Sequence, residues 1–206
     1  MTPTLAEFWL PLTIFALVAA FTPGPNNLML AASGMNYGFR ATVPHMMGVS
    51  LGFPVMLLSV IFGTGALIAG VPLMHDVMPV LSAGFIAYFA WKIATADTDL
   101  SLQSTRRPLT IWQAALFQWV NPKGWAVAIA VASLYAPGGI HEWKKALYMA
   151  LLFFAITVAC TSCWTSLGTA IRSMLRDAGV RRWVNRGMAV ALLLTMVPIL
   201  LNESLS

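Results

Sequence analysis

The composition of this 206-residue chain excludes an ordinary soluble domain, because 59% of its residues are hydrophobic and only 9% are charged. Soluble domains carry about 25% charged residues, and they cannot hide so much apolar surface from water. The formal net charge of +5 comes from basic residues between apolar segments, which suits anionic lipid headgroups. The sequence has no basic stretch interleaved with aromatic residues, so we expect membrane lipids and no nucleic acid among its partners.

Six apolar segments follow one another along the chain, at about 8–36, 44–70, 77–95, 109–136, 143–167 and 183–201. A membrane-spanning helix needs roughly 20 apolar residues. We therefore predict an all-α membrane protein with about six transmembrane helices in a single membrane domain over residues 1–206. The stretch before Leu10 contains Glu7 and neither Lys nor Arg, unlike a secretory signal, so we expect the first segment to remain as a helix.

The first segment is interrupted in its middle by Thr22-Pro23-Gly24-Pro25-Asn26-Asn27. Two prolines around a glycine remove backbone donors and cannot continue a regular helix. In hydrocarbon, each freed polar group costs several kcal/mol unless protein or a wet cavity satisfies it. We therefore predict a broken helix, whose second half begins near the membrane midplane and offers its free N–H groups to an anion.

The second segment contains Gly48 and Gly52, and the fifth contains Cys160 and Cys163 among Ala155, Ala159 and Ser166. Small residues at four-residue spacing let membrane helices approach closely. We interpret both sets as helix-packing residues. A Cys-x-x-Cys redox motif is the alternative for the cysteine pair.

The fourth segment is interrupted by Asn121-Pro122-Lys123-Gly124. Residues 12–15 match residues 109–112 at an offset of 97, and the same offset brings Pro25 onto Pro122. Chance can match apolar positions, but the shared proline break favours an internal repeat with halves of about 1–96 and 109–206. Three helices in each half place the halves in opposite orientations, so we predict two inverted three-helix repeats with helices 1 and 4 broken.

Lys and Arg predict the orientation of the chain, because they are enriched in cytoplasmic loops. One side of a six-helix arrangement holds Lys144 and Lys145. The other side holds Arg40, Lys92, Arg106, Arg107, Arg172, Arg176, Arg181, Arg182 and Arg186. We therefore predict that the second side is cytoplasmic and that both termini lie outside.

The breaks belong to a set of motifs: Thr22-Pro23-Gly24-Pro25-Asn26, Gly38-Phe39-Arg40, Gly48-x-x-x-Gly52 and Asn121-Pro122-Lys123. These motifs resemble the signatures of the LysE/RhtB translocators, and the family's third helix is matched by Gly84, Tyr88, Trp91 and Lys92. Within the family, residues 47–53, 91–95 and 163–164 are most similar to the cysteine/O-acetylserine exporter branch. In the family, an aromatic run and a Pro-Gln pair often follow Asn-Pro-Lys. Here the corresponding residues are 124–127 and 134–137, which read Gly-Trp-Ala-Val and Leu-Tyr-Ala-Pro. This difference falls in the part of the chain that is expected to form the substrate pocket.

The resemblance implies a bacterial inner-membrane exporter of small amino acids or their derivatives, of the cysteine/O-acetylserine or the homoserine/threonine type. It also implies protons as the coupling ion, and it leaves a homo-oligomer open. We expect the substrate to bind between the two breaks, where amide side chains meet its polar ends and Lys123 meets its carboxylate. The predicted substrate-binding residues are Thr22, Pro23, Gly24, Pro25, Asn26, Asn27, Gln118, Asn121, Pro122 and Lys123.

Lys123 is the one cation far inside a predicted span. A buried ammonium is costly and usually functional, so we expect it to face a carboxylate or opposing carbonyls, with snorkelling as the alternative. No Asp or Glu lies inside a predicted span. Proton coupling is therefore left to Lys123 and His45, although we interpret His45 first as a hydrogen-bonded interfacial histidine.

Two other classes of function, a membrane electron carrier and a membrane enzyme, fit the sequence less well. A membrane thiol-disulfide electron carrier needs a cysteine at the break in each half, whereas both cysteines lie in the fifth segment. An enzyme needs clustered catalytic groups, and no Ser-His-Asp or zinc-ligand pattern is present in a plausible place. We predict no catalytic residue, no metal site and no cofactor.

Overall fold

The computed structural model describes residues 8–63, 72–96, 107–136, 143–175, 177–195 and 197. Every regular element in these ranges is helical, which confirms the all-α prediction for this part of the chain. The elements are α1 (Leu10–Phe21), α2 (Pro25–Tyr37), α3 (Phe39–Ile61), α5 (Pro72–Ala94), α6 (Ile111–Phe117), the 3-10 turn η2 (Gln118–Val120), α7 (Pro122–Tyr135), α8 (Trp143–Met174) and α9 (Ala178–Leu194). Residues 97–106, 137–142 and 176, which lie between the predicted segments, are outside the described residues.

Several helix boundaries differ from the predicted segments. α5 begins at Pro72, because proline is well suited to a first helical position. His75 and Asp76, which lie between the predicted segments 44–70 and 77–95, therefore belong to a helix. α8 continues to Met174, and the side chain of Asp177 accepts a hydrogen bond from Val180 N (2.9 Å) at the start of α9. This cap starts a new helix directly, and the basic residues Arg172, Arg181 and Arg182, which lie between the predicted segments, therefore lie on α8 and α9.

Both proline breaks are present. α1 and α2 are bent by 54° at their junction, where Gly24 is fully extended with φ −171° and ψ 179°. In the second half, α6 passes through η2 to Asn121, which is extended, and α7 then starts at Pro122. Each second helix starts at a proline because the first helical N–H has no intrahelical partner to lose.

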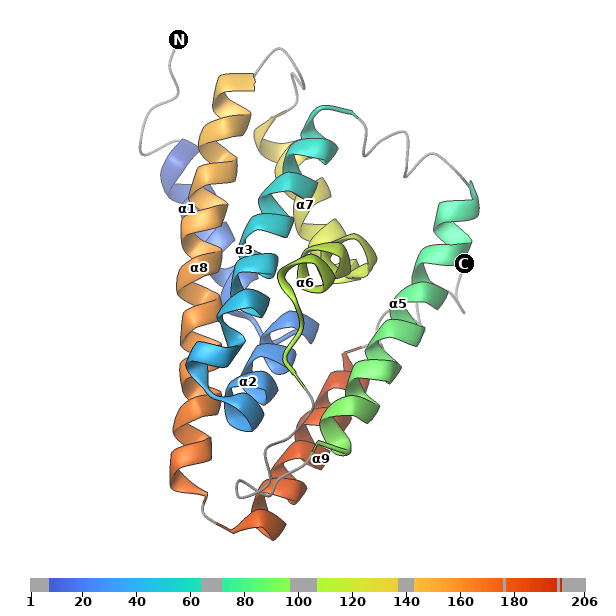
Figure 1. Ribbon diagram of the computed structural model, residues 1–206. Coiled ribbons are helices and arrows are strands. Elements are labelled where there is room, and N and C mark those ends of the chain that lie inside the picture. Colours follow the sequence, from blue (N-terminus) through green and yellow to red (C-terminus); the bar gives the residue numbers. More distant parts are fainter. Residues whose placement is uncertain are drawn as a thin grey trace.

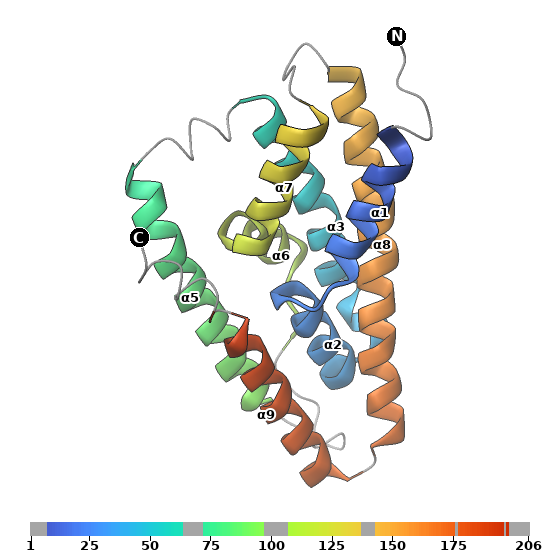
Figure 2. The same cartoon turned by 180° about the vertical axis from the view of Figure 1, so that it is seen from behind.

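The two breaks lie at the centre of the bundle and the chain passes them in opposite directions (Figure 1). The pair α1–α2 runs downward in Figure 1 while α7 runs upward, and α6 lies across the bundle. Likewise α3 runs upward and α8 downward, and α5 runs downward and α9 upward. Figure 2 shows α5 and α9 side by side, away from α1 and α8.

Two apolar clusters lie on either side of this centre. One joins α2, α3, α5, α6 and α9 around Ile86, Phe89 and Phe117. The other joins α1, α3, α7 and α8 around Leu57 and Phe153. The breaks therefore lie between two packed regions, where irregular backbone is sheltered from lipid.

Glycines set the closest helix contacts. A Cβ on Gly34 of α2 would lie 2.3 Å from Thr165 O of α8, and one on Gly48 of α3 would lie 2.3 Å from Ile111 O. A Cβ on Gly52 would lie 2.8 Å from Ala115 Cα of α6. The packing role predicted for Gly48 and Gly52 is confirmed, because only glycine permits such approach.

The packing role predicted for the small face of α8 is wrong for most of that face. Ala155, Ala159, Cys163 and Ser166 are exposed. Their spacing of three or four residues shows that they share one helix face, but the sequence pattern does not say whether this face meets another helix of the chain. Within α8, Gly168 instead packs closely against α2, because a Cβ there would lie 1.9 Å from Ala31 O.

Two of the described helices are long and apolar enough to cross a membrane alone, Phe39–Ile61 and Trp143–Met174. The bent pair Leu10–Phe21 and Pro25–Tyr37 passes the same test as one broken span. These helices support a membrane protein.

Candidate functional site

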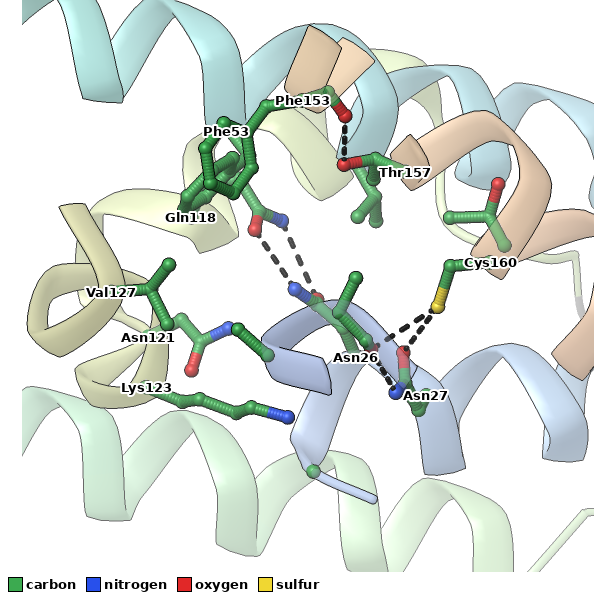
Figure 3. Close-up of a pocket in the computed structure, with 16 residues that line it drawn as sticks. Asn26, Asn27, Phe53, Gln118, Asn121, Lys123, Val127, Phe153, Thr157 and Cys160 are labelled. Atoms are coloured by element: carbon green, nitrogen blue, oxygen red, sulfur yellow. Dashed lines mark hydrogen bonds between the residues drawn. The ribbon is translucent and has the colours of Figure 1, made fainter. Parts of the chain in front are cut away.

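A cavity lies where the two breaks meet (Figure 3). It contains about 570 Å³ of empty space, counting its open mouth. The lining residues come from both breaks and from α3 and α8: Ala19, Ala20, Gly24, Asn26, Asn27, Val49, Phe53, Gln118, Asn121, Lys123, Gly124, Val127, Phe153, Thr157, Cys160 and Thr161.

Six of the ten residues predicted from the sequence line this cavity: Gly24, Asn26, Asn27, Gln118, Asn121 and Lys123. The other four, Thr22, Pro23, Pro25 and Pro122, shape the breaks around it. Pro23 is exposed, and Pro25 is buried as the first residue of α2. Thr22 contributes its backbone carbonyl to the site, where it accepts a hydrogen bond from Lys123.

Three side chains bond across or within the breaks. Asn26 Nδ2 donates to Gln118 Oε1 (2.8 Å), which joins α2 to η2. Lys123 Nζ donates to Thr22 O (2.5 Å) at the end of α1. Asn27 Nδ2 donates to Ala20 O (2.8 Å) and to Thr22 O (3.0 Å). The last carbonyls of α1, which have no intrahelical partner, are thus satisfied by residues of the candidate site.

Two helix N-termini meet at the cavity without a side-chain cap. The N-cap residues are Gly24 for α2 and Asn121 for α7, and neither makes a capping hydrogen bond. The first N–H groups of a helix lack intrahelical partners and carry a partial positive charge. Together with the ammonium of Lys123, they make this part of the cavity suitable for an anion such as a carboxylate.

The cavity also has an unused acceptor. Asn121 is 3% exposed, and its Oδ1 has no hydrogen-bond partner. A buried acceptor without a partner carries a desolvation cost of about 1–3 kcal/mol, which a donor on a bound molecule removes. An ammonium group is such a donor, so the cavity offers complementary partners for both charged ends of a zwitterion.

The opposite wall was not identified from the sequence. Val49 and Phe53 reach the cavity from α3, and Phe153, Thr157 and Thr161 reach it from α8. Thr157 Oγ1 donates to Phe153 O (2.6 Å), so its oxygen remains as an acceptor toward the cavity. The four-residue spacing of Thr157 and Thr161 indicates one helix face, but not which neighbour that face meets.

The two cysteines lie in different surroundings. Cys160 is buried, lines the cavity and donates from Sγ to Ala20 O (3.2 Å). Cys163 is exposed on another face of α8, and both thiols are free. The packing interpretation therefore holds for Cys160 and is wrong for Cys163 within this chain.

Two buried groups differ from the sequence interpretation. His45 is 2% exposed and neither ring nitrogen has a hydrogen-bond partner, so it is not a hydrogen-bonded interfacial histidine. Arg181, which lies between the predicted spans, is also buried, in the first turn of α9. Among the side chains that the structure describes, the one carboxylate is the exposed Asp177.

Comparison with known proteins gives one family. The model of the family described as LysE type translocator matches residues 17–202. The chain is 29% identical over 201 residues to the cysteine/O-acetylserine efflux protein of Escherichia coli strain K12, covering 97% of this chain and 99% of that protein. Proteins with the same name from Shigella sonnei strain Ss046 and Escherichia coli O139:H28 are similar to the same extent. No solved structure matches the chain significantly.

Proposed function

The chain belongs to the LysE type translocator family, and we propose that it exports small amino acids or their derivatives across the bacterial inner membrane. The observation that carries this proposal is the cavity at the two breaks. Its uncapped helix N-termini and Lys123 suit a carboxylate, and the free oxygen of Asn121 suits an ammonium group. A free amino acid carries both groups on one carbon.

The substrate is a small amino acid with a short polar or thiol side chain. Relatives similar along the whole chain are named cysteine/O-acetylserine efflux proteins. In this cavity the wall opposite the breaks carries Thr157, Cys160 and Thr161 beside Phe53 and Phe153. Hydroxyl groups there accept a polar side chain, and the aromatic rings limit its size.

The transport cycle follows from an arrangement of about six spans in two inverted three-helix halves within one membrane domain. The proposal is supported by the opposite chain directions of α2 and α7, α3 and α8, and α5 and α9 in Figure 1. Rocking of one half against the other would expose the cavity to each side of the membrane in turn. Export is driven by the proton gradient in this proposal, with Lys123 at the central cavity as the titratable candidate.

The proposal is tested by export from cells that lack the protein and from cells that overproduce it. Cells are loaded with a panel of labelled amino acids, including cysteine, O-acetylserine, homoserine, threonine and leucine, and release is followed over time. We expect faster release of cysteine or O-acetylserine and unchanged release of leucine. A protonophore should abolish the difference. Equal release of every amino acid from both strains would contradict the proposal.

The proposed topology, with both termini outside, predicts the behaviour of C-terminal fusions. Among the described residues, Arg40 lies at the start of α3, Arg172 near the end of α8 and Arg182 near the start of α9, and these helix ends lie in the lower half of Figure 1. Lys144 and Lys145 lie at the start of α8, which is at the top of Figure 1. A C-terminal alkaline phosphatase fusion should therefore be active and a fluorescent-protein fusion dark. The reverse pattern would overturn the predicted orientation of the chain in the membrane.

The alternative function, a thiol-disulfide electron carrier, predicts that the cysteines are indispensable. The proposed export has no step that uses a thiol, so we expect Cys160→Ser with Cys163→Ser to retain most of the export rate. A serine hydroxyl can replace the thiol as donor to Ala20 O. The measurement is export at matched membrane levels, with Cys163→Ser alone as the control. Complete loss of activity in the double variant, at normal expression, would favour the redox function.

A further inference from the structure

A second cavity lies at the other end of α2. It contains about 380 Å³ of empty space, and α2, α3, α5 and the segment 107–109 surround it. Its polar and charged lining residues are Ser33, Asn36, Tyr37, His45, Lys92 and Arg107. None of them lines the central cavity, so the two cavities have separate sets of residues.

His45 is the unexplained group in this second cavity. Its ring lies 98% inside the protein, yet Nδ1 and Nε2 have no hydrogen-bond partner. A neutral imidazole has one N–H donor and one acceptor nitrogen, and both normally find partners when buried. Because His45 lines the cavity, a bound molecule can supply the missing partner.

The neighbouring groups indicate the chemistry of that molecule. The other polar side chains are already engaged: Ser33 bonds with Thr42 (2.9 Å), and Asn36 exchanges two hydrogen bonds with Asn185 (2.9 Å each). Lys92 and Arg107 add positive charge, and no described carboxylate lines the cavity. A histidine donor beside two cations suits a small oxyanion, of which a carboxylate is the common form.

α2 connects this cavity to the central one. Asn27 lines the central cavity and Asn36 lines the second, and nine residues of helix correspond to about 14 Å. We propose that the second cavity is a loading site, in which His45 and Arg107 bind the carboxylate of the amino acid before it moves along α2 to the central cavity. This inference rests on the proposed export function and on the proposed cytoplasmic position of this end.

The test uses transport into inside-out membrane vesicles, which present the cytoplasmic face to labelled L-cysteine kept reduced. His45→Leu should raise the KM for L-cysteine about tenfold, the effect of losing a hydrogen bond to a charged group. Vmax should stay within about twofold, because the central cavity is intact. Arg107 is exposed, so Arg107→Gln cannot disturb a core, and it should raise KM in the same direction. The matched control is Arg182→Gln, at an exposed position outside both cavities, with unchanged KM.

Two further measurements distinguish a site for the substrate carboxylate from a site for a lipid phosphate. L-cysteine methyl ester lacks the carboxylate, so its KM should not differ between the wild type and His45→Leu. If the site binds a lipid phosphate instead, purified protein reconstituted into phosphatidylcholine vesicles should show a higher KM for L-cysteine when phosphatidylglycerol is included. An unchanged KM in both His45→Leu and Arg107→Gln, with active wild-type vesicles, would overturn the loading site. Inactive wild-type vesicles in either orientation would instead overturn the export function.

Discussion

Lys123→Met is expected to reduce export at least tenfold at matched membrane levels. The variant keeps the length and apolarity of the side chain but removes the ammonium that lies 2.5 Å from Thr22 O. One of three N–H donors is used in this bond, so the others remain for a substrate carboxylate. A hydrogen bond to a charged group contributes about 1.5–3 kcal/mol, which corresponds to roughly tenfold or more in binding.

Lys123→Arg should restore only part of the rate. The lysine stem passes close to Gly24, where an added Cβ would lie 2.9 Å from Lys123 Cδ and 3.2 Å from Nζ. A planar guanidinium is larger than an ammonium and distributes its donors differently, so it cannot occupy the same position. For the same reason Gly24→Ala should displace the lysine and lower export.

The control for these variants is Lys144→Met, which removes an exposed cation at the start of α8 and should leave the rate unchanged. Export is measured with the amino acid that responds most strongly in the panel of labelled substrates. Normal export by Lys123→Met would mean that the breaks are structural and that the carboxylate is bound elsewhere.

The breaks could be predicted because proline acts locally. Pro25 and Pro122 lack the N–H that a continuous helix needs, whatever surrounds them. The structure accordingly starts α2 and α7 at these two residues. The polar residues of the site follow from the breaks, since free backbone groups in a membrane must meet polar side chains.

The rest of the cavity depends on which helices pack together, and local sequence patterns do not determine this pairing. Thr157 and Thr161 on α8 look like any small polar residues in an apolar helix until α8 packs beside α2. His45 similarly appears near the start of an apolar segment, where an interfacial position is expected. It is buried because α5 and the segment 107–109 enclose the end of α2 and α3.

The contact between α2 and α8 leads to the second large expected effect, on stability. A Cβ on Gly168 would lie 1.9 Å from Ala31 O and 2.7 Å from Ala31 C. These are backbone atoms and cannot move aside singly, so Gly168→Ala must push the two helices apart. Overpacking of this kind costs about 1–3 kcal/mol. We expect a clearly lower midpoint of thermal denaturation for the detergent-solubilised protein, followed by fluorescence-detected size exclusion, and a lower membrane level.

Gly187→Ala is the matched control, because the same added methyl group meets no atom within 4 Å. Alanine favours a helix over glycine by roughly 0.5–1 kcal/mol, so this variant should be equally or slightly more stable than the wild type. The two substitutions are chemically identical and predict opposite signs. If both variants melt alike, α2 and α8 do not pack at this distance. The wall that places Cys160 beside Ala20 and Asn27 would then be wrong as well, and with it the shape of the central cavity.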